Sequence, residues 1–325
     1  MNHSFRKNGF TLIELLVVVA IIALLIGLLV PVLSSARNSA QLAGSLSNLR
    51  QNTIAAVAYS SDNDNLWPIL PVSRDAFGGL QDPSPTATTH FFEWASGGTN
   101  TSTYWRSSNS GNFLSFADDR PLNQYIYPDR NFADDGLRPD PRSATLTREQ
   151  RLARRSGRMV DELRSKLDAF LCPGDYGSIA RDTPFDNEVS GSQIIDIPDR
   201  DLERTGYEDV GTSYMTNRLH VIELARQRNV DSRRIQIWIE AARFIQQATY
   251  ANPSRFSWLH DQTMWVVPHF GGTGELGNFG QEDKAVSAFI DGSARYVTLE
   301  RRNLDSEGFN EATKTSEYQM VFDRY

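Results

Sequence analysis

The hydrophobic and polar positions of the chain are distributed most unevenly near its N-terminus. Of the 27 residues from Phe10 to Ala36, 21 are hydrophobic and Glu14 alone is charged. The 22 uncharged residues from Leu15 to Ala36 would form about 33 Å of helix at 1.5 Å per residue, enough to span a hydrocarbon core. Because the run is apolar on all sides, it predicts a membrane-spanning helix and not an amphipathic core helix.

The residues on either side of this run predict how it crosses the membrane. Arg6 and Lys7 precede it, so the positive-inside rule keeps the N-terminus cytoplasmic and exports the rest of the chain. A cleaved secretory signal would have an apolar region of about 7–15 residues and a small-residue cleavage site, which residues 33–36 resemble only weakly. An ordinary signal anchor fits everything except Glu14, because a carboxylate in a membrane helix costs roughly 2.5–3.5 kcal/mol. We therefore expect a single-pass protein with an exported body.

Helical spacing continues past the apolar run, although the composition becomes polar. A stripe of apolar and small residues recurs at spacings of 4, 3, 4 and 3 and consists of Leu42, Leu46, Leu49, Thr53 and Ala56. Polar residues are expected on the other faces: Arg37, Asn38, Gln41, Ser45, Asn48 and Asn52. The pattern predicts one helix from Phe10 to about Ser60, roughly 75 Å long, whose stripe packs on a head. An Asp- and Asn-rich turn and Pro68 then end it.

The remaining residues, 61–325, form the exported head in this interpretation, as one large or two small domains. Residues 73–123 are rich in Gly, Ser, Thr and Asn with scattered aromatics, which indicates short strands and long loops. A capping-box pattern at 147–150 opens a basic helix that we expect to reach about Asp168. Segment 175–209 is acidic, so this helix docks either on that segment or on a neighbouring molecule.

Two patterns in the last third of the chain predict strands. Segment 235–240 alternates between apolar and polar positions, as a strand does. Segments 285–290 and 294–299 flank the pair Asp291-Gly292, which predicts a β-hairpin with both turn positions at positive φ. We therefore predict an α+β fold, in which a long N-terminal helix packs on an antiparallel sheet and the head carries an inserted helical region.

Composition and charge exclude several classes of function. Among the 325 residues there is one cysteine, Cys172, which excludes a disulfide framework and a Cys-rich zinc module and is expected to be buried. The formal charge of −7 argues against a nucleic-acid partner. No nucleotide-binding, zinc-protease or serine-hydrolase motif is present in the sequence. The histidines of the body lack metal-ligand spacing: His90, His220, His260 and His269.

The turn after the long helix contains the metal candidates of the sequence. Asp62 and Asp64 could ligate calcium through their carboxylates. The EF-hand glycine is absent, however, and no glutamate follows at the position of the bidentate ligand. We therefore predict no metal and no cofactor.

The segment that opens the apolar run reads Lys-Asn-Gly-Phe-Thr-Leu-Ile-Glu from Lys7 to Glu14. Together with the run that follows, it resembles the type IV prepilin N-terminal cleavage and methylation signature. The resemblance implies that a prepilin peptidase cuts between Gly9 and Phe10 on the cytoplasmic face and that the new Phe10 amine is N-methylated. It also implies that Glu14, in a filament, pairs with the Phe10 amine of a neighbouring subunit or with its own.

Pro31 matches a proline that this family commonly carries in the same helix. It removes one backbone N–H and weakens the preceding turn. It is therefore either a place where the helix stretches or kinks during assembly or a tolerated membrane-helix proline. By the same resemblance, the face of the helix that is turned away from the head would meet neighbouring subunits.

Segments of the head resemble the large-headed prepilin-like proteins of planctomycetes and their relatives. They are Phe-Leu-Cys-Pro-Gly-Asp at 170–175 and Gly-Thr-Ser-Tyr-Met-Thr-Asn at 211–217. The His-x9-Asp-Gly signature of that family is similar to His269 with Asp291 and the glycine after it, although 21 residues separate the two here. The difference implies an inserted loop over 273–283 and leaves a joint role of His269 and Asp291 open.

These features predict a non-enzymatic structural subunit of a type II secretion-like pseudopilus or a type IV pilus-like filament. Its parts would be a leader (1–9), a transmembrane assembly helix (10–36), an amphipathic extension (37–60) and a head (61–325). The expected partners are copies of itself or related pseudopilins, prepilin peptidase, the inner-membrane secretion or pilus machinery, and membrane lipid around Phe10–Ala36. The head would lie in the periplasm or outside the cell.

Two alternatives stay open. The protein could be a surface adhesin or ligand-binding pilin whose aromatic loops at 90–105 contact a glycan or polymer. It could also be a membrane-anchored exported hydrolase that uses His260 or His269.

Overall fold

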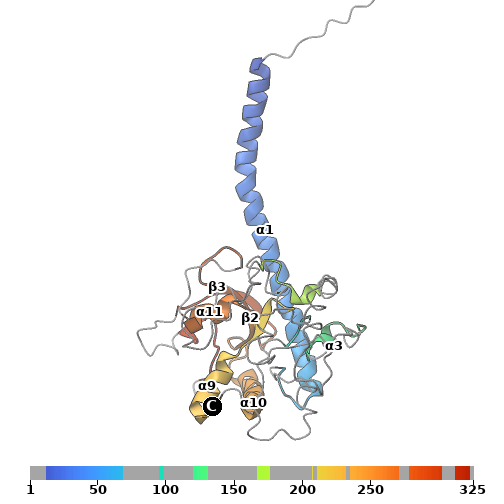
Figure 1. Ribbon diagram of the computed structural model, residues 1–325, viewed down its shortest axis with the longest axis vertical. Coiled ribbons are helices and arrows are strands. Elements are labelled where there is room, and N and C mark those ends of the chain that lie inside the picture. The colour runs from blue at the N-terminus through green and yellow to red at the C-terminus, as the bar shows by residue number, and fades with distance from the viewer. Residues whose placement is uncertain are drawn as a thin grey trace, which may run out of the picture.

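The computed structural model shows one long helix that extends out of an α+β head (Figure 1). It describes residues 12–68, 95–98, 120–130, 167–175, 207, 211–231, 235–270, 278–301 and 312–322. The predictions for 73–123, 147–168 and 175–209 lie almost entirely outside these ranges. The predicted fold class is confirmed, because the long N-terminal helix is followed by an antiparallel sheet and further helices.

The long helix, α1, runs from Leu12 to Asp62 and ends two residues later than the sequence predicts. A tight turn closes it, in which the backbone N–H groups of Asn63 and Asn65 both donate to the carbonyl of Ser60, at 3.3 and 2.9 Å. Asp64 and Asn65 have positive φ values of 53° and 59°. Asp and Asn adopt this left-handed conformation more readily than most residues, which is why a cluster of them ends the helix.

The sheet has four antiparallel strands in the order β1-β2-β3-β4. The strands are β1 (Tyr214–Thr216), β2 (Ser257–Asp261), β3 (Lys284–Phe289) and β4 (Ala294–Thr298). Met215 pairs with His260, and His260 pairs with Ser287, so this row of residues crosses three strands. The register of β2 against β3 shifts between Ser257 and Leu259, which marks a bulge.

The hairpin predicted around Asp291 is confirmed, but its turn differs from the expectation. The N–H of Gly292 donates to the carbonyl of Phe289 at 3.0 Å, and the N–H of Phe289 donates to the carbonyl of Ser293 at 2.8 Å. Gly292 has a φ of 86°, whereas Asp291 has no positive φ. The expectation of two positive-φ residues was wrong because the loop has three residues, with a type I turn followed by a left-handed glycine.

Segment 235–240 begins a helix, α10 (Ile235–Ala251), so the prediction of a strand there was wrong. The buried side chains of α10 recur at helical spacing: Ile237, Trp238, Ala241, Ala242 and Ile245. A window of six residues is too short to separate this period from the alternation of a strand, and the pattern is helical only when it is followed to Ile245.

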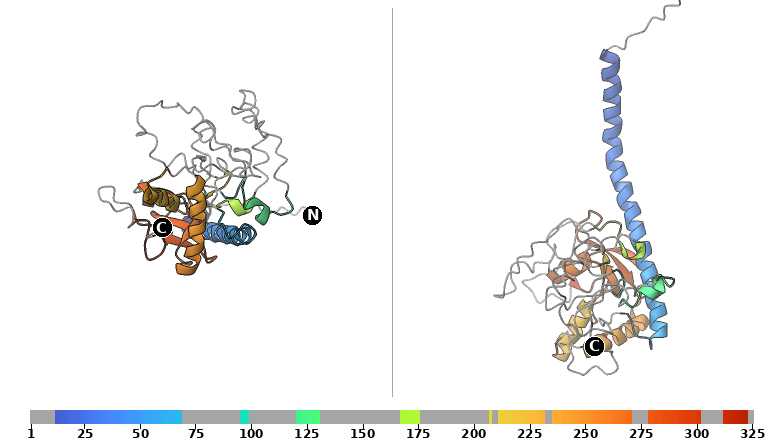
Figure 2. Two further views of the ribbon diagram at one scale, coloured as in Figure 1. Left: turned by 90° about the horizontal axis from the view of Figure 1, so that it is seen from below. Right: turned by 45° about the vertical axis from the view of Figure 1, so that its right-hand side comes forward.

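Helices cover both faces of the sheet, as Figure 2 shows from two further directions. On one face, α1 and α10 share a core with side chains of β2, β3 and β4. On the other face, α11 (Thr263–Phe270) packs against β3 and the C-terminal segment. The helix α9 (Leu219–Arg228) lies beside α10 and contributes side chains to both cores. Two short helical segments, α3 (Asn123–Ile126) and η3 (Asp168–Phe170), lie beside the lower part of α1.

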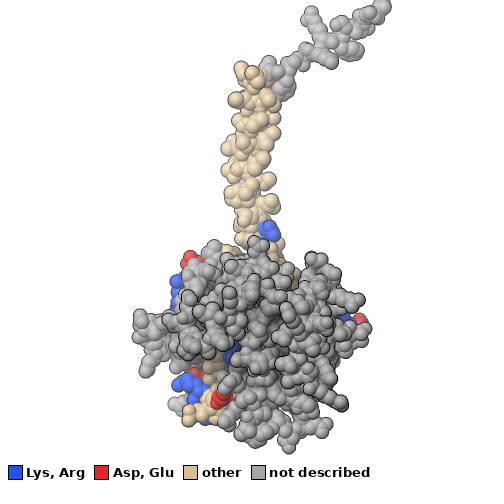
Figure 3. Space-filling model, viewed as in Figure 1, with Lys and Arg blue, Asp and Glu red and all other residues tan. Residues whose placement is uncertain are grey.

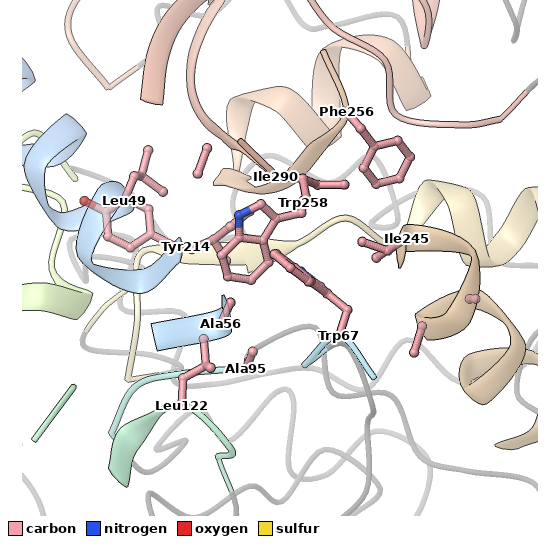
Figure 4. Close-up of a cluster of buried hydrophobic side chains, with 14 of the residues drawn as sticks. Leu49, Ala56, Trp67, Ala95, Leu122, Tyr214, Ile245, Phe256, Trp258 and Ile290 are labelled. Atoms are coloured by element: carbon pink, nitrogen blue, oxygen red, sulfur yellow. The ribbon is translucent and has the colours of Figure 1, made fainter. Parts of the chain in front are cut away.

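Trp258 stands at the centre of the core between α1 and the sheet (Figure 4). Its indole N–H donates to the hydroxyl of Thr53 at 3.0 Å, and its ring meets Trp67 edge-on at 5.3 Å between centroids. Leu49 and Ala56, one turn on either side of Thr53, are completely buried. The apolar stripe predicted on α1 is therefore confirmed as its head-facing side, and α1 belongs to the core of the head.

Gly44 lies where α1 meets head segment 171–175. A Cβ atom at Gly44 would come within 3.3 Å of Cγ of Pro173, closer than ordinary van der Waals contact. The segment has no room to retreat, because a Cβ at Gly174 would lie 2.6 Å from the carbonyl oxygen of Asn278 and 2.7 Å from the ring of Phe279. The segment is therefore held tightly between α1 and residues 278–279.

We expect Gly44→Leu to destabilise the head by about 2 kcal/mol, because overpacking costs more than the gain in helix propensity. For a domain of this size, Tm should fall by roughly 4–8 °C. Near-UV circular dichroism of the full chain in detergent measures the change. Gly27→Leu is the control, since a Cβ at Gly27 meets nothing within 4 Å. Equal melting of the two variants would contradict close packing at Gly44.

Candidate functional site

The upper part of α1 is an apolar surface that the head leaves uncovered. Residues 12–40 are all exposed, and the large hydrophobic side chains from Leu12 to Leu33 are 45–85% exposed. Among the described residues, α1 is the one helix long and apolar enough to cross a membrane, with a mean hydropathy of 3.3 over its most apolar window. Burying each such side chain is worth about 1.5–3 kcal/mol, so this stalk needs lipid or other apolar helices around it. Figure 3 shows the stalk above the head.

Glu14 lies in the first turn of α1 and is exposed. A carboxylate at this position interacts favourably with the dipole of the helix, so Glu14 does not weaken the helix that carries it. Gly9 and Phe10 lie outside the described residues. Cleavage between them, methylation of Phe10 and pairing of Glu14 with the Phe10 amine therefore stay predictions.

Pro31 lies inside α1 and does not end the helix. It cannot donate a hydrogen bond to the carbonyl four residues earlier, which belongs to Gly27, and a glycine weakens a helix by itself. Both residues lie in the exposed part of α1, which curves along its length in Figures 1 and 2. One weak turn thus falls within the apolar stalk, and its role as a hinge stays a prediction.

The lower part of α1 is joined to the head by four polar side chains, which we name the polar seam: Gln41, Ser45, Asn48 and Asn52. They follow one another at spacings of 4, 3 and 4 residues and so share one side of the helix. Ser45 and Asn52 are completely buried. The sequence predicts these residues on faces other than that of the apolar stripe, and each precedes a stripe residue by one, or about 100° around the helix. This second face also meets the head, because the head offers backbone carbonyls for its amides to bind.

The amides of the polar seam donate to backbone carbonyls of one head segment, 168–173, which includes η3. The bonds, with their N···O distances, are Asn48 to Asp168 (2.7 Å) and Leu171 (2.8 Å), Asn52 to Ala169 (2.8 Å), and Gln41 to Pro173 (2.8 Å). A helix as short as η3 leaves most of its carbonyls without an internal partner. The seam supplies partners to carbonyls of this segment, and the bond from Asn52 to Ala169 is buried.

The remaining contacts of the polar seam reach two other parts of the head. The Ser45 hydroxyl lies 2.9 Å from the Tyr214 hydroxyl on β1 and donates to Sγ of Cys172 at 3.4 Å. Oδ1 of Asn52 accepts a hydrogen bond from the Ser96 hydroxyl at 2.7 Å. The sequence analysis did not predict that these side chains bind the head. The signal for it was the recurrence of amides and hydroxyls at spacings of 4, 3 and 4 residues.

The polar seam fixes the rotation of α1 in the head. Sliding the helix by one residue would turn it by about 100° and leave buried donors and acceptors unpaired, at about 1–3 kcal/mol each. Glu14 and Arg50 are 36 residues apart, or ten turns at 3.6 residues per turn, so they share one side of the helix. Arg50 is exposed. Helical periodicity therefore places Glu14 on the side opposite the seam, turned away from the head.

A buried polar cluster lies behind the polar seam. Cys172 is buried, as predicted, and burial raises the pKa of its thiol to about 12. Asn278 lies between Cys172 and Asp261, with Nδ2 at 4.0 Å from the sulfur and 3.3 Å from Oδ2 of Asp261. Burial also raises the pKa of Asp261 to about 7, against the opposing effect of the N–H groups of Val286 and Met264 that donate to its carboxylate. The thiol is thus protonated and shielded at neutral pH.

The described histidines are placed as core residues. His260 is completely buried, its Nδ1 lies 2.6 Å from the backbone carbonyl of Asp261, and burial lowers its pKa to about 4. His220 is also completely buried, between the carbonyls of Asn217 and Ala241, and burial lowers its pKa to about 4 as well. Neither imidazole is open to a substrate, so the structure gives a His260 hydrolase no support.

Other candidate residues of the sequence have fewer described contacts. Asp291 caps its own turn by accepting the N–H of Ser293 at 2.9 Å. The side chain of His269 and all of His90 lie outside the described residues, so a joint role of His269 with Asp291 is not tested. Oδ2 of Asp62 accepts the Tyr125 hydroxyl at 3.0 Å. Within the described ranges, no three His, Cys, Asp or Glu side chains come together as a metal site would need.

We expect Asn52→Ala to destabilise the head by about 3 kcal/mol, because it leaves the Ala169 carbonyl and the Ser96 hydroxyl buried without their partner. The thermal melt of the full chain in detergent should shift down by roughly 6–12 °C. Gln51→Ala removes the neighbouring exposed amide and serves as the control. A melt of Asn52→Ala that coincides with that of Gln51→Ala would refute the polar seam.

Comparison with known families finds one match. Residues 4–30 match the family model described as the prokaryotic N-terminal methylation motif. No curated protein and no solved structure matches the chain. The matched residues include Gly9, Phe10, Glu14 and most of the apolar stalk. The chain therefore carries the methylation motif of a type IV prepilin on a single apolar helix, and its helix-and-sheet architecture is consistent with a pilin-like fold.

Proposed function

We propose that the chain is a pilin-like or pseudopilin-like subunit that is stored in the cytoplasmic membrane and drawn from there into a filament. One observation supports this most: an exposed apolar helix has the methylation motif at one end and is built into the core of a folded head at the other. In this proposal residues 1–9 are the leader, 10–36 the membrane and assembly helix, 37–60 its extension and 61–325 the head. Arg6 and Lys7 keep the leader cytoplasmic, which sends the head to the periplasm.

The transfer from lipid to filament leaves the head unchanged in this proposal. The contacts between α1 and the head lie within one chain, so no subunit has to break them to leave the membrane. The apolar stalk exchanges lipid tails for apolar helices of other subunits, which are about as hydrophobic as lipid. Glu14 is the group whose free energy falls on assembly. Neither lipid nor an apolar bundle solvates its carboxylate, and a neighbouring Phe10 amine would neutralise it.

The mature N-terminus tests the processing step. We expect mass spectrometry of the membrane-bound protein, produced with a prepilin peptidase, to show a chain that begins with N-methylated Phe10. Gly9→Val should leave the leader attached, because a branched side chain obstructs the backbone at the cut. Gly27→Val is the control and should be cut normally, as a Cβ at Gly27 meets nothing. An intact Met1 in the native protein, or a cut after Ala36, would rule out the proposal.

Replacing Glu14 tests assembly separately from anchoring. We expect Glu14→Gln to insert into the membrane and to be processed as the native chain is, because a neutral amide is cheaper to place in lipid than a carboxylate. Incorporation into sheared filaments should fall at least tenfold, since the attraction to the Phe10 amine is lost. Ser35→Ala, which changes an exposed polar residue just beyond the other end of the stalk, should incorporate normally. Normal incorporation of Glu14→Gln would disprove the pairing.

A further inference from the structure

A short polar neck separates the apolar stalk from the head. The stalk ends at Leu33, and the first described hydrogen bond from α1 to the head is made by Gln41. The seven residues between them, Ser34 to Ala40, are all helical and exposed. At 1.5 Å per residue the neck is about 10 Å long. One leaflet's headgroup layer is about 5–8 Å thick, so the neck is long enough to cross it and leave the head just outside.

Arg37 is the one charged residue of the neck, and of the whole helix between Glu14 and Arg50. It is exposed and makes no hydrogen bond or ion pair with the residues that the structure describes. It follows Leu33 by four residues, which puts it about 6 Å outside the apolar boundary. This height is within the headgroup layer, where the guanidinium group finds phosphate oxygens that it binds in a bidentate manner.

The described segment of the head that flanks the neck does not compete for this cation. Segment 278–283 flanks the neck, since a Cβ at Gly280 would lie 3.9 Å from Nδ2 of Asn38. The carboxylates of this segment are already bound by Arg301, which lies 2.6 Å from Asp283 and 3.5 Å from Glu282. Among the residues that the structure describes, Arg37 thus has no acidic partner, and Figure 3 shows basic atoms at the base of the stalk.

We propose that Arg37 binds the phosphates of the lipid headgroups in the leaflet next to the head and so sets the depth at which the stalk rests in the membrane. The apolar stalk supplies the affinity for the bilayer, and Arg37 fixes its height, because burial of the guanidinium in hydrocarbon and its withdrawal into water both lose the phosphate contact. The proposal concerns the membrane-inserted chain and holds whether or not the chain then enters a filament.

A depth measurement on the full chain tests this proposal. A nitroxide on Ser39→Cys reports the height of the neck by power saturation with oxygen and a nickel chelate. The native Cys172 is buried and its thiol stays protonated, so the folded chain is labelled at residue 39. The protein is reconstituted in vesicles of phosphatidylglycerol and phosphatidylethanolamine. In Arg37→Gln we expect the label to lie about 3 Å deeper, the rise of two residues, because a neutral amide enters the apolar layer more easily.

Three controls decide the interpretation. Arg37→Lys keeps the charge and should restore the native depth, whereas Arg50→Gln, which removes the next exposed arginine of α1, should not move the label. Inorganic phosphate added to vesicles should not move it either, and a shift there would assign the site to free phosphate and overturn the proposal. Equal label depths in the native chain and Arg37→Gln, or an equal displacement in Arg50→Gln, would also overturn it. Each of these results is independent of filament formation.

Discussion

The hydrogen bonds between the polar seam of α1 and the carbonyls of segment 168–173 are the constraint on which the rest of the molecule depends. The bonds of Asn52 are buried, so breaking them leaves polar groups away from water, and the bonds of Asn48 add a second fixed point; together they favour one rotation and one height of the helix. Apolar packing around Leu49 and Trp258 adds stability on the same side, but hydrophobic contact alone would tolerate small slides. The seam therefore supplies specificity and the apolar core supplies most of the free energy.

Because α1 is a single helix, a constraint on its lower part extends to its upper part. The ten turns between Arg50 and Glu14 transmit the rotation set by the seam to the start of the stalk, where Glu14 is turned away from the head. In the proposed filament, a neighbouring subunit would then approach Glu14 without meeting the head of the same chain. The weak turn at Gly27 and Pro31 lies between these two ends. If it is the predicted hinge, bending there would change the direction of the stalk while the seam stays intact.

The sequence predicted the features that depend on local composition. The apolar stalk, the end of α1 near Asp62 and the hairpin around Gly292 each follow from a few adjacent residues. The polar seam was not predicted, because amides and hydroxyls at helical spacing look like a solvated face until the carbonyls that they bind are known. The start of α10 was misread for a different reason, since six residues contain fewer than two helical turns.

The division of α1 into a polar seam and an apolar stalk explains why the single charge of Glu14 says so much about the function of a chain of 325 residues. Exchange of lipid for apolar helices changes the free energy of the stalk little. The core of the head is the same in the membrane-bound chain and in the proposed filament. Neither the stalk nor the head therefore favours one relative position of two subunits over another. A carboxylate that is costly in lipid and in an unpaired apolar bundle, but compensated by an amine in one relative position of two subunits, distinguishes that position from all others. In the proposed function, Glu14 therefore selects the register, and the polar seam ensures that every subunit presents it on the same side.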